Sequence, residues 1–210
     1  DESSSQFVGR VTGLPLMSED ESNLFHIGLG IRYDNGEEPY RYLARSEFNQ
    51  SPVFVDAGEF NADSTLTYDL EATWRRGPYW LAAEIVRNEV SAPQLGDPVF
   101  GGYHLTGSWV LTGEMRPYNK RNGTMGPVPV SKSVYQGGRG AWEATARYST
   151  LDLDDGAISG GEMDVWSLGL NWYLSPIIAV NLNYRHTVLD RFGVKGHSDG
   201  IMARVVLVLE

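Results

Sequence analysis

The sequence predicts an all-β protein, an antiparallel transmembrane β-barrel with about ten strands in this chain. Three observations predict it: a two-residue alternation of side chains, the order of long and short connections, and many amphipathic aromatic residues. Within residues 163–174, Trp166, Leu168 and Leu170 alternate with small or polar residues such as Ser167. Because successive side chains of a β-strand point to opposite sides, such a segment has one apolar and one polar face.

The same alternation recurs along the chain and defines each predicted strand in turn. No stretch of comparable length shows the i, i+3, i+4 spacing of an amphipathic helix. The predicted strands are residues 7–14, 23–33, 40–48, 65–76, 79–90, 99–113, 140–150, 163–174, 177–188 and 200–210.

The connections between these strands alternate in length. The longer ones are residues 15–22, 49–64, 91–98, 151–162 and 189–199. Asp34–Pro39 is shorter, and Gly77-Pro78 and Ser175-Pro176 are tight turns. Outer-membrane barrels have short periplasmic turns and longer extracellular loops. If the chain ends in the periplasm and each strand crosses the membrane once, counting strands back from the carboxyl end places all three short connections on the periplasmic side. This favours a membrane barrel over a soluble sandwich.

Composition agrees with this class and excludes others. The 210 residues contain 6 Trp and 11 Tyr against 7 Phe, and amphipathic rings suit a membrane–water boundary. The absence of Cys rules out disulfides and thiolate metal sites, and the net charge of −10 argues against nucleic acid as a partner. The chain opens Asp1-Glu2-Ser3 without a signal peptide, so we expect a mature form or, given the strand count, a fragment.

The connection at residues 114–139 breaks the length rule, because it is long where a short periplasmic turn is expected. Between Met115 and Ala141 it carries five basic residues and no acidic one. It is either a solvated basic loop or a segment folded into the lumen, where positive charge would raise the local anion concentration. The five basic residues are Arg116, Lys120, Arg121, Lys132 and Arg139.

Several runs of residues resemble those of one porin family. They are Phe54-Val55-Asp56, Glu71-Ala72 followed by Gly77-Pro78, Thr112 to Tyr118, Gly140-Ala141-Trp142-Glu143, Arg147-Tyr148-Ser149, Asn171-Trp172-Tyr173, Asn183-Tyr184-Arg185, and the ending from Asp199-Gly200 through Leu209. Together they resemble the phosphate-selective porin O and P family over nearly the whole chain.

The resemblance implies a homotrimeric porin of the bacterial outer membrane with sixteen-stranded monomers. Residues 1–210 would form a single domain, the carboxyl-terminal portion of such a barrel. Its partners would be outer-membrane lipid and small inorganic anions, with phosphate or polyphosphate as the expected solute, and it would need no cofactor. One departure is the ending Val208-Leu209-Glu210, where barrels commonly finish on an aromatic residue.

Parity also assigns inward-facing arginines to the predicted strands. Together with the five basic residues of the connection they form the candidate anion pathway, with arginine suited to phosphate because its planar fork donates two hydrogen bonds. Each strand arginine could instead pair with a carboxylate such as Glu143 or Glu84. The basic residues of the connection are better candidates for the anion pathway than the strand arginines, because no acidic residue lies near them in the sequence. The strand arginines are Arg10, Arg32, Arg147, Arg185 and Arg204.

The opposite parity predicts a lipid-facing surface with aromatic girdles. The predicted lipid face is Ile27, Leu29, Ile31, Leu66, Leu70, Leu105, Leu111, Leu168, Leu170, Leu182, Val205 and Leu207. The predicted girdle residues are Tyr33, Trp74, Tyr79, Trp109, Trp142, Tyr148, Trp166, Trp172 and Tyr184.

Two alternatives stay open at the level of sequence. One is a soluble β-barrel that binds a ligand, whose apolar faces would pack together. The other is an enzyme embedded in an outer-membrane barrel, but the inward-facing His26 and His104 have no recognisable Ser or Asp motif beside them.

Overall fold

The computed structural model describes residues 5–36 and 39–208 and is built almost entirely of β-strands. Nine strands form one antiparallel sheet in the order β1-β2-β5-β6-β7-β10-β11-β12-β13. Among the described residues, no helix is long and apolar enough to cross a membrane. The nine strands are β1 (Gln6–Met17), β2 (Asn23–Asp34), β5 (Ser64–Arg76), β6 (Tyr79–Ser91), β7 (Val99–Val110), β10 (Ala141–Asp155), β11 (Ile158–Ser175), β12 (Ile178–Arg191) and β13 (Val194–Leu207).

The other elements lie in two long connections. The connection from β2 to β5 contains the hairpin β3 (Tyr40–Arg45) and β4 (Val53–Phe60), which we call the inner hairpin. The connection from β7 to β10 contains the short pair β8 (Tyr118–Asn119) and β9 (Thr124–Met125) and the 3-10 turn η2 (Val134–Gln136). A second 3-10 turn, η1 (Pro93–Leu95), lies between β6 and β7.

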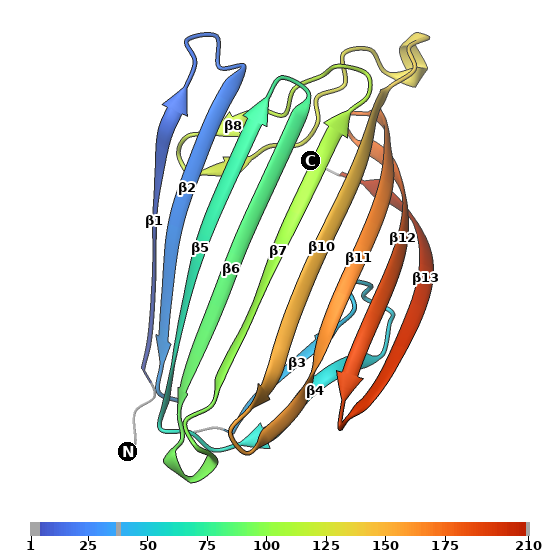
Figure 1. Ribbon diagram of the computed structural model, residues 1–210. Coiled ribbons are helices and arrows are strands. Elements are labelled where there is room, and N and C mark those ends of the chain that lie inside the picture. The colour runs from blue at the N-terminus through green and yellow to red at the C-terminus, as the bar shows by residue number, and fades with distance from the viewer. Residues whose placement is uncertain (1–4, 37–38, 209–210) are drawn as a thin grey trace.

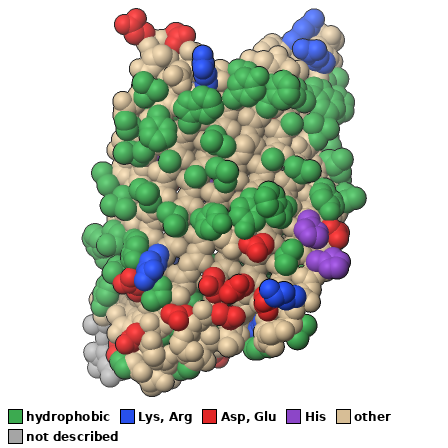
Figure 2. All heavy atoms as spheres, viewed as in Figure 1, with side chains coloured by type: hydrophobic (Ala, Val, Ile, Leu, Met, Phe, Trp, Pro, Cys, Tyr) green, Lys and Arg blue, Asp and Glu red, His purple; other side chains and the backbone are tan. Residues whose placement is uncertain are grey.

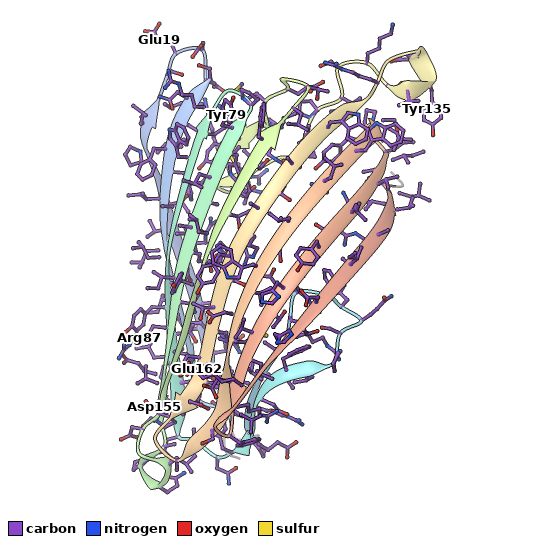
Figure 3. The ribbon with its side chains drawn as sticks, turned by 45° about the vertical axis from the view of Figure 1, so that its right-hand side comes forward. Glu19, Tyr79, Arg87, Tyr135, Asp155 and Glu162 are labelled. Carbon is purple, nitrogen blue, oxygen red and sulfur yellow. The ribbon has the colours of Figure 1, made fainter. Side chains whose placement is uncertain are left out.

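Figure 1 shows the sheet as a curved wall of tilted strands, with the inner hairpin near one end and the β8–β9 pair near the other. The turns at residues 77–78 and 176–177 lie at the end where β13 finishes, together with residues 18–22 and 111–140. The connections at residues 35–36 and 39–63, 92–98, 156–157 and 192–193 start from the opposite end. Figure 3 shows the same division, with Glu19, Tyr79 and Tyr135 at one end and Asp155 at the other.

One predicted wall strand is wrong. Residues 40–48 do not join the sheet; their first part forms β3, which pairs with β4 inside the predicted connection 49–64. Both kinds of strand have period-two alternation, so the pattern alone does not separate a wall strand from a hairpin packed against the wall. Because residues 40–48 do not cross the wall, the connections that precede them in the chain lie at the end opposite to the predicted one. Asp34 therefore lies at the end opposite the turns at 77–78 and 176–177, and residues 18–22 lie with those turns.

Two predicted long loops are also wrong. β10 and β11 extend to a two-residue turn at residues 156–157, and β12 and β13 to one at 192–193. The strands here carry charged residues on their outer side, including Asp152 and Glu162, whereas Leu153 on the inner side is buried, so the alternation reverses its sides before the strands end. The strands therefore project beyond the apolar part of the wall.

The outer face of the sheet is apolar and exposed, as the alternation predicts. Leu29, Leu70 and Leu168 are 52%, 56% and 58% exposed, and every predicted lipid-face and girdle residue has the outward parity. Figure 2 shows this as a broad hydrophobic band, with charged residues gathered below it. A soluble barrel would pack these side chains inward, so the face suits lipid.

Aromatic pairs mark both borders of the band. Near the turns at residues 77–78 and 176–177, Trp142 stacks on Trp172 with ring centroids 5.1 Å apart, and Tyr79 stacks on Trp109 at 5.8 Å. Six residues further along β10, Tyr148 lies 4.4 Å from Trp166. At about 3.4 Å per residue the two rows are roughly 20 Å apart along the strand. Because strands of outer-membrane barrels tilt by about 35–45°, this separation corresponds to a height of about 15 Å, which fits within their apolar band of about 25 Å.

The inner face is mostly polar, but the inner hairpin covers part of it with a small core. Val55 and Phe60 of β4 pack with Phe100, Met163 and Val165 of the wall, and all five are buried. The larger of two hydrophobic clusters in the described residues thus lies between the wall and the hairpin that folds back on it, and this contact positions the hairpin tip.

Candidate functional site

The candidate site is the inner face of the sheet together with the two segments that fold against it. The inner hairpin enters from the end that carries residues 156–157. The basic connection, residues 114–139, enters from the opposite end, which carries the turns at residues 77–78 and 176–177. Each segment is held to the wall by ionic and hydrogen-bonded contacts, and these contacts decide which charges stay free.

The tip of the inner hairpin, residues 46–52, is attached to β10 and β11 through Glu47. Arg147 donates from Nε to Oε1 of Glu47 at 2.7 Å, and the Ser149 hydroxyl donates to the same oxygen at 2.7 Å. The Ser167 hydroxyl donates to Oε2 at 3.0 Å. All three donors have inward parity on neighbouring strands, so the wall presents a cradle for one carboxylate.

The backbone and charge state of Glu47 both fit this cradle. Its φ of 62° lies in the left-handed region, which is uncommon for a residue other than glycine and concentrates at functional sites. Burial alone would raise the pKa of Glu47, but hydrogen bonds from Ser149, Arg147 and Ser167 and the Arg147 charge outweigh it. The pKa is therefore held below the usual 4.5, and Glu47 is ionised at neutral pH.

A second contact holds the same tip to β12. Arg185 donates to the carbonyl and the hydroxyl of Ser46. Its guanidinium lies 4.4 Å from the ring centroid of Phe48 and 5.8 Å from that of Phe54. No carboxylate of the described residues lies within salt-bridge distance of Arg185, so its charge is stacked on aromatic rings rather than neutralised.

The basic connection is anchored through Arg116 and Glu143. Arg116 donates to Oε1 of Glu143 from Nε at 3.0 Å, and its second nitrogen reaches both oxygens at 2.8 and 2.9 Å. Glu143 also accepts from Ser108, from Asn171 at 3.0 Å and from the Tyr173 hydroxyl at 2.8 Å. The Glu143 side chain is fully buried, so the only charge that compensates it in the described residues is Arg116.

A second anchor lies on β1, β2 and β5. The Tyr118 hydroxyl is 2.7 Å from Nδ1 of His26, whose Nε2 is 2.9 Å from Glu71, and Glu71 pairs with Arg10. Gly123, with φ +66°, lets the β8–β9 turn approach closely, because a Cβ there would lie 2.9 Å from the Thr12 hydroxyl. The first part of the basic connection thus covers the inner face of these strands.

The ten predicted pathway residues fall into two groups. Five are paired with carboxylates: Arg10 with Glu71, Arg32 with Asp34, Arg116 with Glu143, Lys120 with Glu21 and Arg147 with Glu47. The other five have no carboxylate within 4.0 Å among residues 5–36 and 39–208; they are Arg121, Lys132, Arg139, Arg185 and Arg204. The sequence-based reason for weighting the basic connection is therefore wrong for Arg116 and Lys120, because their partners come from distant segments.

The sequence analysis missed Arg45 and the role of Glu47. Arg45 lies on β3 and lines a hollow of about 670 Å³ with Arg32, Glu84, His104 and Arg147. A second hollow of about 440 Å³ is lined by residues that include Arg204, Asn183 and Gln50. Glu47 and Arg147 line both hollows, so their ion pair separates them. No local signal marks Glu47, since Arg147 is 100 residues away in the chain.

The inner face also carries an acidic side. Asp69 on β5 and Glu84 on β6 point inward, and Glu84 lies 3.6 Å from His104. Arg147, Arg185 and Arg204 lie on β10, β12 and β13. These acidic and basic groups therefore lie on different strands of the inner face. Among the described residues, no group of three or more His, Asp or Glu side chains is placed to hold a metal ion.

This fold, an antiparallel sheet with an apolar outer face and a polar inner face that does not close on itself in the described residues, is consistent with a porin-like β-barrel. The sequence profile of the phosphate-selective porin O and P family matches residues 21–197, and the chain belongs to that family. Membership of a porin family points to a channel of the bacterial outer membrane rather than to an enzyme.

One relative is similar over most of the chain. It is an uncharacterized protein of Caulobacter vibrioides, 32% identical over 162 residues. The match covers 74% of this chain but 29% of the relative, so the chain spans less than a third of that protein's length.

Proposed function

We propose that this chain forms part of the wall and the narrow region of an outer-membrane porin that passes small anions. The observation that carries the proposal is the pair of inner-side arginines Arg45 and Arg204, which line the hollows at the inner hairpin and have no carboxylate within 4.0 Å among the described residues. Arg185 also lacks such a partner, but it is buried against Phe48 and lines neither hollow. Fixed positive charge near low-dielectric walls concentrates anions, and several separate sites let an anion enter and leave.

The nine strands would belong to a larger closed barrel, with this chain as its carboxyl-terminal portion. In the described residues β1 and β13 are the edges of the sheet and do not pair with each other. Unpaired backbone groups in hydrocarbon cost several kcal/mol each, so an open sheet would not span a bilayer alone. Further strands would close the wall, and assembly as a homotrimer and preference for phosphate or polyphosphate belong to the same proposal.

The paired basic residues have a structural role in this scheme. Arg116 and Arg10 hold the basic connection against the inner face, which narrows the space that an ion can use. Arg121, Lys132 and Arg139 are exposed near the rim, where they would attract anions before entry. Anions would pass along β10 to β13 through the hollow that Arg204 lines, whereas the hollow that Arg45 lines also contains Glu84.

The test is the zero-current potential of the whole protein in a planar bilayer under a KCl gradient. We expect chloride to permeate faster than potassium, and Arg204→Gln to lower that preference. Arg87→Gln is the matched control, because this substitution makes the same change in charge on the outer face. Arg87 is 54% exposed there and is paired with Glu89. Cation preference in the wild type, or an equal effect of the two variants, would contradict the proposal.

A further inference from the structure

The cradle that holds Glu47 is a preformed binding site occupied by the protein's own carboxylate. Its donors are Arg147, Ser149 and Ser167, at 2.7, 2.7 and 3.0 Å from the two carboxylate oxygens. Arg147 is fixed from its other side, because its NH1 donates to the Thr106 hydroxyl at 2.8 Å. Since the donors stand on the rigid wall and the acceptor on a hairpin tip, the cradle keeps its geometry when the tip moves.

We propose that this cradle is a binding site for small carboxylate solutes in transit and that Glu47 is a tethered competitor for it. The proposal rests on the proposed function, since the solute reaches the site through the anion path. The donor set already holds a carboxylate, with Nε of Arg147 and the Ser149 hydroxyl on one oxygen and the Ser167 hydroxyl on the other. A solute carboxylate that replaced Glu47 would inherit the same hydrogen bonds.

The surroundings give a solute access to the cradle. Glu47 and Arg147 border both hollows, so a molecule in either one reaches the ion pair directly. The Glu47 side chain is 27% exposed and that of Arg147 33%, so neither is sealed from the solution. Arg204 lines the second hollow and adds positive charge on the approach.

The tip of the hairpin can release Glu47 without unfolding the hairpin. The hydrophobic core under the hairpin involves Val55 and Phe60 of β4, and the neighbouring residue Ser46 keeps its own contact with Arg185. The left-handed φ of 62° means that the native backbone at Glu47 is one that a non-glycine residue rarely adopts. Exchange would therefore consist of rotation of one side chain, after which the passage between the hollows is open.

The experiment measures block of the chloride current through the whole protein by added acetate. We expect the half-blocking acetate concentration to fall at least about tenfold in Glu47→Gln, because the tethered charge no longer competes. Glu47→Gly, which suits the left-handed backbone, should give the same gain. Glu59→Gln is the matched control on the same hairpin, since Glu59 is 70% exposed and 3.9 Å from Arg41, away from the cradle.

Three results would overturn the inference. One is an unchanged acetate block in both Glu47 variants. The second is a gain that persists when Arg147→Gln is added, because the cradle would then not be the site. The third is a gain for phosphate as large as that for acetate. Line broadening of labelled acetate by the detergent-solubilised protein measures the same binding without a current, so loss of conduction with intact binding would count only against the proposed function.

Discussion

The buried pair of Arg116 and Glu143 should be the main attachment of the basic connection to the wall. Glu143→Ala removes the acceptor for Arg116, Ser108, Asn171 and Tyr173 at once. Breaking a buried pair from one side leaves an uncompensated charge and typically costs about 3–5 kcal/mol. We expect a loss near the lower end of that range, because the Arg116 side chain is 19% exposed and water can reach it.

Two assays follow from this magnitude. The free energy of unfolding in detergent micelles should fall by about 3 kcal/mol. If the loss is local, trypsin should cut after Lys120 or Arg121 on the order of 100-fold faster, because cleavage follows the population of the open form. Arg116→Met combined with Glu143→Ala should lower the free energy of unfolding by less than the sum of the two single changes, since each single change leaves the other partner buried without its counter-charge.

Lys195→Met provides the control for this experiment. Lys195 pairs with Asp190 at 3.3 Å, but Lys195 is 80% exposed, and such surface pairs contribute about 0–1 kcal/mol. The reasoning would be refuted if Glu143→Ala cost less than Lys195→Met, or if the two changes at Arg116 and Glu143 were simply additive.

Three further predictions concern other parts of the molecule. Leu182→Lys, on the outer face at 48% exposure, should cost about 2–4 kcal/mol in lipid, whereas Asn183→Lys, on the inner side of the same strand, should be tolerated; folding yields into vesicles would compare them, and equal losses would contradict the assigned orientation. Because its pKa is lowered, Glu47 stabilises the docked tip at neutral pH and loses this contribution as pH falls through its folded-state value, below 4.5; chloride conductance should therefore rise in acid in the wild type but not in Glu47→Gln. Tyr118→Phe removes the contact to His26 at 2.7 Å and should cost about 1 kcal/mol, seen as faster proteolysis of the basic connection, with Tyr135→Phe, 70% exposed, as the neutral control.

The wall could be predicted from the sequence because its cause is local. Each residue between the two aromatic rows faces either lipid or the interior. The side chain type of Leu168 or Ser167 therefore predicts its face of the sheet without knowledge of any contact partner. The prediction stopped where that cause stopped. Around Asp152 and Asp154 the outer face of β10 meets water while Leu153 on the inner face packs under the inner hairpin, so the alternation reverses its sides, and a strand was read as a loop.

The inner side could not be predicted because its causes are distant in the chain. Residues 40–48 have a strand pattern that fits the wall as well as the hairpin, and only the contacts of Val55 and Phe60 with the wall distinguish them. Arg147 and Glu47 are 100 residues apart, and Arg116 and Glu143 are 27 apart. Charge counted along the sequence therefore misjudged which basic residues are free.

The acidic residues of the inner face explain how an acidic chain can still present positive charge to an ion. Glu47, Glu71 and Glu143 each neutralise one arginine and, in doing so, fix an inserted segment to the wall. Arg185 is held instead by Ser46 and two aromatic rings, which position it without cancelling its charge. In the proposed porin, selectivity would depend less on the number of arginines than on the kind of partner each one has, and we expect loss of the Glu47 carboxylate to turn Arg147 from a structural arginine into one that binds the solute.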